Sequence, residues 1–231
     1  SANNLLKPQD GQPVTVPTQD MVIGCYYLTI DMPNEKGEGK RFTSLEEAVM
    51  AYDFGDIGLH APISIRVTRE TADGPKVGMI QSTLGRFLFN EIIPQDLGFV
   101  DRSDPDNTFV LEFDQLIGKN DLQRIIDKCI HTRGISETAD VLDRIKRLGF
   151  HYSTKGGISI GIFDMIVPDI KKQYVTEAEQ RVEMINRRFQ QGLLNEDGRY
   201  EAVVETWRVT TDEITEELKK NLGRFNPVNM M

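Results

Sequence analysis

The chain has little of what secreted, membrane-spanning or metal-binding proteins are built from. Only two cysteines occur among its 231 residues, Cys25 and Cys129, and their spacing fits neither a disulfide framework nor a metal-ligand motif. No apolar run approaches the roughly 20 residues that a membrane-spanning helix needs. We therefore expect reduced thiols, no membrane contact and a cytoplasmic protein.

Positive charge is scarce as well. The chain has 27 Lys and Arg residues and 36 Asp and Glu residues, which gives a formal net charge of −9 at pH 7. Such a surface repels phosphates, so we expect no direct binding of duplex DNA. The chain begins in polar sequence without the basic and apolar regions of a signal peptide, and it ends on apolar residues. We expect a piece cut from a longer chain.

Catalytic motifs are also missing. The triplet Asp53-Phe54-Gly55 holds magnesium in protein kinases, but no glycine-rich loop or catalytic loop accompanies it here, so we interpret it as a helix end. Gly37-x-Gly39-Lys40 resembles half of a phosphate loop, yet residues 34–40 are more typical of a polar turn. The three histidines are scattered along the chain. The residues alone therefore predict no catalytic site, no metal site and no cofactor.

The last third of the chain contains the clearest pattern. Two segments, from about Pro168 to Gln191 and from about Glu196 to Leu222, carry apolar residues at spacings of three and four. Gly192 suits a left-handed helix end, and Asn195 can cap the following helix. Because so short a connection makes two helices antiparallel, we predict a coiled-coil hairpin over about 168–223. We expect it to project as an arm and to meet partners.

Two groups of residues in this hairpin have predicted roles. The predicted seam sets Tyr174, Val182, Ile185 and Phe189 against Val204, Trp207, Ile214 and Leu218. At the tip, leucines framed by charges are typical of a docking patch, where apolar contact supplies affinity and charge supplies orientation. The predicted partner-binding residues are Leu193, Leu194, Asn195, Glu196, Asp197, Arg199 and Glu201. The alternative is that the leucines fold back and close the hairpin.

The first half of the chain mixes helix and strand signals. A capping-box pattern at Ser44 predicts a short helix from Leu45 to about Tyr52. Residues 63–67 alternate as a strand with one buried face, and residues 77–80 can form the returning strand. The apolar segment from Met21 to Ile30 fits a helix or a strand. We predict a mixed α/β region over residues 1–112.

The sequence after residue 112 is predominantly helical. Asn120 can cap a helix over residues 121–131, and Ser136 can cap a second helix before the hairpin. We therefore predict an α+β fold, in which the mixed region is followed by a helical region over residues 113–231.

Four stretches, in the same order, resemble the bacterial RNA polymerase β′ subunit. The resemblance spans essentially the whole chain, and four ordered blocks are far more specific than any one motif. The matching blocks are Ser1 to Leu6 running through Pro17 to Asp20, Thr83 to Asn90 with Pro94, Gly157 to Gly161 with Asp164, Met165 and Pro168, and Pro227 with Met230 and Met231.

The resemblance implies a place around the secondary channel, through which nucleoside triphosphates reach the active centre. Residues 1–112 would belong to the pore region and the rest to the funnel region, with the hairpin as the rim helices where Gre-type transcript-cleavage factors dock. The other RNA polymerase subunits would be partners. The residues expected to line the pore are Asn3, Asn4, Gln19 and Asp20.

The resemblance also implies what this segment lacks. The family's magnesium-binding signature, Asn-Ala-Asp-Phe-Asp-Gly-Asp, does not occur in it, and neither do the bridge helix and trigger loop. The parent complex would be a DNA-directed RNA polymerase that binds Mg outside this segment, and the chain alone would be inactive. Two other hypotheses remain open: a free-standing coiled-coil interaction module, and a small nucleotide-binding enzyme built on residues 1–112.

Overall fold

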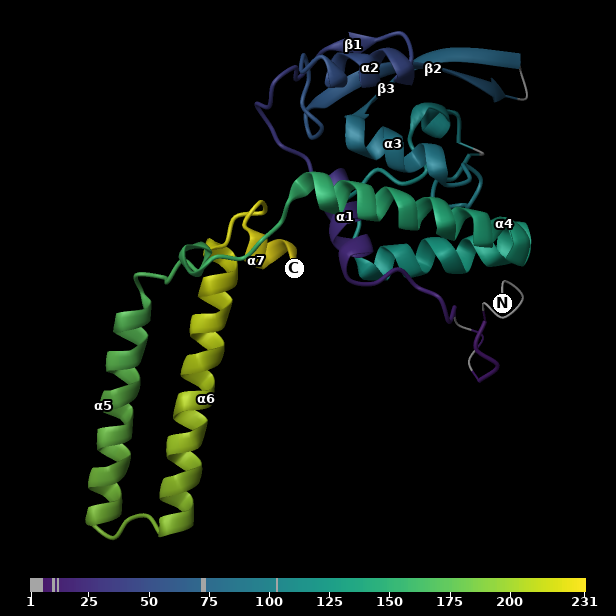
Figure 1. The fold of residues 1–231 in the computed structure, drawn as a ribbon. Coiled ribbons are helices and arrows are strands. Elements are labelled where there is room, and N and C mark those ends of the chain that lie inside the picture. Colours follow the sequence, from purple (N-terminus) through teal and green to yellow (C-terminus); the bar gives the residue numbers. More distant parts are fainter. Residues whose placement is uncertain (1–5, 10, 12, 72–73, 103) are drawn as a thin grey trace. The chain divides into compact units, whose positions relative to one another are not determined.

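The computed structural model describes residues 6–9, 11, 13–71, 74–102 and 104–231, and it divides into one compact unit that ends at Ile158 and a second that begins at Ser159 (Figure 1). The first unit contains α1 (Asp20–Thr29), β1 (Arg41–Phe42), α2 (Leu45–Asp53), β2 (Pro62–Thr71), β3 (Gly74–Thr83), α3 (Leu84–Ile92), the 3-10 helix η1 (Pro105–Phe109) and α4 (Lys119–Gly156). The second contains the 3-10 helix η2 (Ile162–Asp164), α5 (Lys171–Gln190), α6 (Glu196–Asn221) and α7 (Pro227–Met230). The predicted α+β fold is confirmed.

A small mixed sheet organises the first unit. Strand β1 pairs in parallel with β2, and β2 pairs antiparallel with β3, so that Ile65 lies opposite both Phe42 and Ile80. Ile63, Ile65 and Ile80 are buried, which gives the sheet one core face as the alternation at residues 63–67 predicts. Both long strands extend beyond the predicted segments.

Helix α2 begins where a local side chain favours it. The Ser44 hydroxyl accepts the backbone N–H of Glu47 at the start of α2, and the predicted helix is confirmed over Leu45–Asp53. The segment that fitted either a helix or a strand is the helix α1. Residues 34–40 form turns, in which Lys40 N–H donates to the carbonyl of Gly37, and Phe54 lies at the end of α2 as expected.

Helix α4 contains both helices that the sequence predicts, separated by a kink at Gly134, whose φ is 82°. Ile126 and Ile130 of its first half pack with Ala139 and Leu142 of its second half, and Figure 1 shows the two halves side by side. The predicted caps at Asn120 and Ser136 are wrong, since Ser136 lies within the helix after the kink. The helix begins at Lys119, and the carboxylate of Asp121 reaches back to accept the N–H of Gly118 at 3.1 Å.

Helix α4 packs closely against α1 within the first unit. A Cβ placed on Gly24 would lie 1.8 Å from the carbonyl oxygen of Gly149, so only glycine allows these two backbones to approach. Ile125 and Ile145 of α4 join the same buried cluster as Leu28 and Ile65. The compact unit thus runs past residue 112, and the assignment of residues 1–112 and 113–231 to pore and funnel regions stays a prediction.

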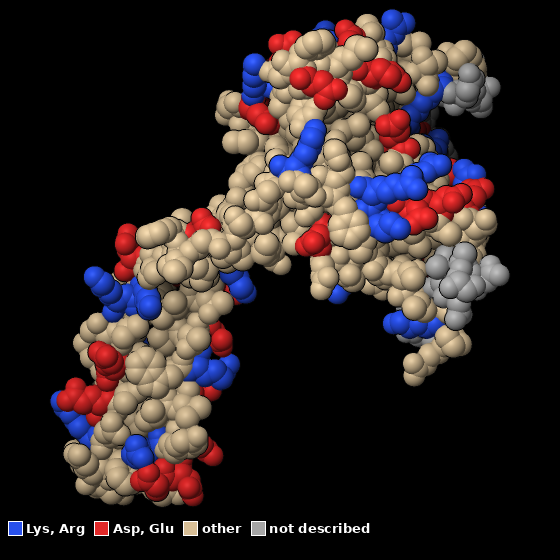
Figure 2. All heavy atoms as spheres, viewed as in Figure 1, with Lys and Arg blue, Asp and Glu red and all other residues tan. Residues whose placement is uncertain are grey.

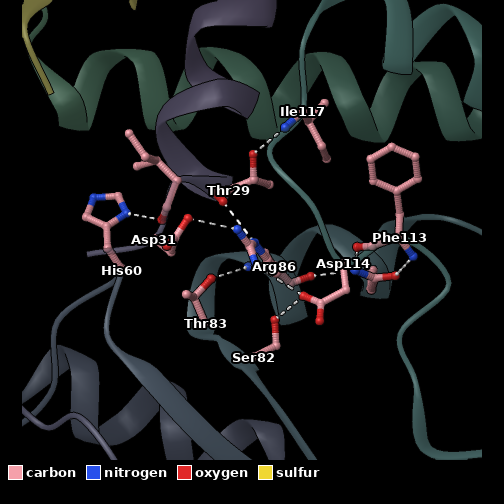
Figure 3. A network of polar contacts seen from close by, with 11 residues as sticks. Thr29, Asp31, His60, Ser82, Thr83, Arg86, Phe113, Asp114 and Ile117 are labelled. Carbon is pink, nitrogen blue, oxygen red and sulfur yellow. Dashed lines mark hydrogen bonds and ion pairs between the residues drawn. The ribbon is translucent and has the colours of Figure 1, made fainter. Parts of the chain in front are cut away.

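Arg86 of α3 connects its helix to the end of α1, to the loop after α1 and to the segment before α4 (Figure 3). The Arg86 guanidinium donates to the Thr29 carbonyl through Nε at 3.0 Å, and it forms ion pairs with Asp31 at 3.1 Å and Asp114 at 3.4 Å. The Ser82 hydroxyl donates to the same Asp114 carboxylate. The Arg86 side chain is only 15% exposed, so these bonds compensate for much of the hydration that it loses.

Two further side chains extend this network into the segment before α4. The Thr29 hydroxyl accepts the N–H of Ile117 at 3.0 Å, and the Asn90 amide exchanges two hydrogen bonds with the backbone of Phe113. Gly85 permits the close packing beside them, because a Cβ there would lie 1.8 Å from the Leu28 carbonyl oxygen. These contacts give a structural reason for the glycine, arginine and asparagine of the block Thr83 to Asn90.

The second unit contains the predicted hairpin. Helices α5 and α6 have nearly the predicted bounds, and they are joined by a short connection with Gly192 at φ 73°. The side-chain oxygen of Asn195 accepts the N–H of Gly198 at 2.9 Å, which confirms the predicted cap.

The predicted seam is wrong on α6 at Val204 and Trp207, while Ile214 and Leu218 are half-buried. Val204 is 47% exposed and Trp207 is 38% exposed, whereas the buried position of α6 is Thr210, and that of α5 is Ala178. The Thr210 hydroxyl donates to the Thr206 carbonyl at 2.8 Å, so it can lie in the seam without an unpaired donor. The seam is therefore centred on Ala178 and Thr210, and Trp207 lies at its edge.

Candidate functional site

The two leucines at the tip of the hairpin differ in exposure. The Leu193 N–H donates to the Arg188 carbonyl at 3.0 Å, and the N–H of Gly192 donates to the Phe189 carbonyl. Leu193 is 70% exposed, while Leu194 is half-buried beside Gly198. Leu194 therefore closes the hairpin, and Leu193 is the leucine that the tip offers to solvent.

One ion pair at the tip serves the hairpin itself. Glu196 is hydrogen-bonded to the Arg199 guanidinium, which also lies over the Phe189 ring at 5.3 Å from its centroid. The hydrogen bond from Arg199 lowers the pKa of Glu196, and the same bond raises the pKa of Arg199. The Arg199 charge is thus paired within the hairpin, and its role in partner binding stays a prediction.

The remaining acidic residues face outward. Asp197 and Glu201 are exposed on the first two turns of α6, and Asp197 lies where the helix dipole favours negative charge. Figure 2 shows that acidic and basic side chains are interspersed over the hairpin, without one dominant sign. The tip thus offers one exposed leucine, Leu193, near the exposed carboxylates of Asp197 and Glu201.

The predicted pore-lining residues belong to the first unit. Gln19 precedes α1 with φ 52° and ψ −127°, a conformation that side-chain-bearing residues rarely adopt, and its side chain makes no capping bond. Asp20 opens the first turn of α1, and both side chains are exposed. Asn3 and Asn4 lie outside the described residues.

A second exposed stripe on the hairpin escaped the sequence analysis. Tyr200, Val204 and Trp207 follow one another along α6 at helical spacing and are all exposed. The spacing itself was visible in the sequence, where it was interpreted as the seam with α5.

Other kinds of site are not apparent in the described part of the chain. No group of three or more His, Cys, Asp or Glu side chains among the described residues is arranged to hold a metal ion. None of the described helices is both long and apolar enough to cross a membrane.

Comparison with known proteins gives consistent matches. Residues 4–165 match the family model described as RNA polymerase Rpb1, domain 3. The DNA-directed RNA polymerase subunit β′ of Acetivibrio thermocellus is 56% identical over 100% of this chain and 20% of its own length. The β′ subunits of Caldanaerobacter subterraneus and Clostridium tetani are 50% and 52% identical, with the same coverage. The chain thus spans about one fifth of these relatives.

Proposed function

The chain belongs to the bacterial RNA polymerase β′ family as an internal fragment, and from this premise we propose that it forms the secondary-channel segment of a DNA-directed RNA polymerase. Its pore residues line the entry route of nucleoside triphosphates, and its hairpin tip docks channel-binding factors of the Gre type. The parent complex works in the cytoplasm, where the other polymerase subunits are its partners.

The geometry of the tip is the observation that best supports factor docking. Leu193 is exposed at the end of a hairpin whose own packing is completed by Leu194, so its burial by a partner needs no rearrangement. Asp197 and Glu201 beside it can orient a factor with a basic surface and raise its association rate.

Nucleotidyl transfer belongs to other parts of the parent complex. We propose that the catalytic Mg is held outside this segment, because this segment lacks the acidic signature of the family. Purified residues 1–231 are then inactive alone. Template-dependent incorporation of nucleotides by this purified chain, above that of a mock preparation, would contradict the assignment.

The docking proposal is tested by a binding titration of a Gre-type factor against the assembled polymerase. Replacing both Asp197 and Glu201 by lysine should weaken binding by about tenfold, since two attractive charges become repulsive. Glu196 is kept, because its loss would break the pair with Arg199 and disturb the hairpin.

A matched control is Glu213→Lys, an exposed reversal about 24 Å farther along α6. It should leave affinity unchanged. Equal effects of the tip and control variants would show a general charge effect and remove the tip from the docking site. Thermal melts of all variants establish that the hairpin remains folded.

The pore proposal is tested at Gln19. The variant Gln19→Gly removes the side chain and accepts the observed backbone conformation without strain, so it separates the side chain's role from that of the fold. We expect altered elongation, pausing or transcript cleavage by the assembled enzyme. Wild-type rates for all three would make Gln19 a structural residue only.

A further inference from the structure

The loop that precedes the hairpin exposes an unusual amount of apolar surface. Ile162 is 90% exposed and Phe163 is 98% exposed, in a stretch whose other large apolar residues are also open to solvent. Together they form what we call the apolar turn: Ile160, Ile162, Phe163, Met165, Ile166 and Val167. Contiguous exposed residues of this kind mark surfaces that contact another polypeptide.

Hydrogen bonds hold the apolar turn in a defined shape. The Asp164 carboxylate accepts the N–H of Gly161 at 2.7 Å, and the Asp164 N–H donates to the Gly161 carbonyl at 3.2 Å. The Asn226 amide also donates to the Asp164 carbonyl at 2.8 Å, which ties the turn to the segment before α7. Ile162 and Phe163 are therefore presented by a braced 3-10 turn, as a preformed docking surface requires.

The character of this surface differs from that of the hairpin tip. Asp164 is the only charged residue between Ile160 and Pro168, and its carboxylate is bonded within the turn. At the end of the second unit that carries η2 and α7, the view in Figure 2 shows mainly uncharged surface. Permanent interfaces are apolar in this way, whereas exchangeable partners are commonly oriented by charge.

We propose that the apolar turn packs permanently against a part of the longer β′ polypeptide that lies outside residues 1–231. The matched relatives are about five times as long as this chain and align with all of it, so further polypeptide of the same molecule, at a fixed ratio, is available to cover the turn. The inference rests on the proposed function only in taking the chain as an internal part of β′. It does not use factor docking at the tip.

The test uses the assembled polymerase with a photoreactive benzoylphenylalanine at position 163, whose cross-linked peptides are identified by mass spectrometry. We expect the main cross-link to join Phe163's position to a β′ peptide outside residues 1–231. A main cross-link to another subunit, to a second copy of β′ or within residues 1–231 would overturn the proposal, as would the absence of any protein cross-link.

A second measurement checks that the surface is covered. In the same complex, Phe163→Cys should react with a maleimide at least about tenfold more slowly than Leu193→Cys, because a packed site reacts only when it opens. Without added factor, Leu193 is the exposed control. Equal labelling rates would overturn the proposal, while a failed factor titration with a positive cross-link would contradict only the docking function.

Discussion

The Asn90 side-chain amide pairs with the backbone of Phe113 in the way that a neighbouring peptide group would. Its Nδ2 donates to the Phe113 carbonyl at 2.8 Å and its Oδ1 accepts the Phe113 N–H at 3.0 Å, both in the buried interior. We predict that Asn90→Ala lowers the free energy of unfolding by about 2–4 kcal/mol, because it leaves two buried backbone groups without partners. Urea unfolding of the purified chain measures the change.

The control for this prediction is Gln81→Ala, which removes an exposed amide from β3. It should change stability by less than about 0.5 kcal/mol. Equal losses for both variants would mean that the Asn90 bonds contribute little.

His60 makes the stability of the first unit depend on pH. Burial lowers its pKa from the ordinary 6.5, although the hydrogen bond between Nδ1 and the Ile30 carbonyl opposes this shift. Between the folded pKa and pH 6.5, His60 is therefore protonated in the unfolded chain but neutral in the folded chain. The stabilisation is fully present above pH 6.5 and is lost as the pH falls through the folded pKa.

We expect the wild-type denaturation midpoint to fall more steeply from about pH 7 to pH 5 than that of His60→Gln, which cannot titrate. The difference between the two slopes is the measured quantity, so a general loss of stability in the variant does not affect it. Parallel pH profiles would exclude His60 as the titrating group.

Contacts between distant residues were beyond prediction from the sequence. Asp31, Arg86 and Asp114 have no common periodicity, and only the folded chain brings them together. The positive φ of Gln19 could not be predicted either, because glutamine rarely adopts it. The positive φ of Gly192 could be predicted, because glycine adopts such angles readily.

Helices and turns were predicted best where their causes are local. Ser44, Gly192 and Asn195 set helix ends through their own geometry and bonds, so α2 and the hairpin connection were predicted correctly. Strand and helix lengths were less predictable, because packing extends them. The Asn120 cap failed because Gly118 and Asp121 provide a competing arrangement that starts the helix two residues earlier.

The hairpin seam illustrates how tertiary packing overrides a correct periodicity. In the first half of α6 two stripes have helical spacing, and the more hydrophobic one, with Val204 and Trp207, was taken as the seam. The structure instead buries Thr210, on the same stripe as the half-buried Ile214 and Leu218 that were correctly predicted. Sequence hydrophobicity ranks tryptophan above threonine and so favours the wrong face.

This seam predicts different sensitivities for the two stripes. Ala178→Asp should destabilise the hairpin by about 3–5 kcal/mol, because it buries a charge without a partner. Trp207→Ala should cost about 1–2 kcal/mol, below the 3–5 kcal/mol typical of a fully buried aromatic residue. Thermal melts followed by helix circular dichroism give both values. A loss of stability above about 2 kcal/mol in Trp207→Ala would show that Trp207 is packed within the seam.

The molecule combines a hydrogen-bonded α/β unit with a hairpin unit that presents a small, distinctive tip. Family membership follows from identity over the whole chain, while the docking role is argued from Leu193, Asp197 and Glu201. The same identity disfavours a free-standing interaction module and a small nucleotide-binding enzyme, since the whole chain aligns within a longer β′ subunit.

Hydrogen–deuterium exchange of the assembled polymerase, with and without a Gre-type factor, tests the docking of that factor most directly. We predict slower exchange of backbone amides in residues 192–201 when the factor is bound, because a partner that buries Leu193 shields these amides and restrains their opening. Residues 171–181, at the far end of α5, should exchange at the same rate in both samples. Bound factor without any protection at the tip would contradict the proposed docking site.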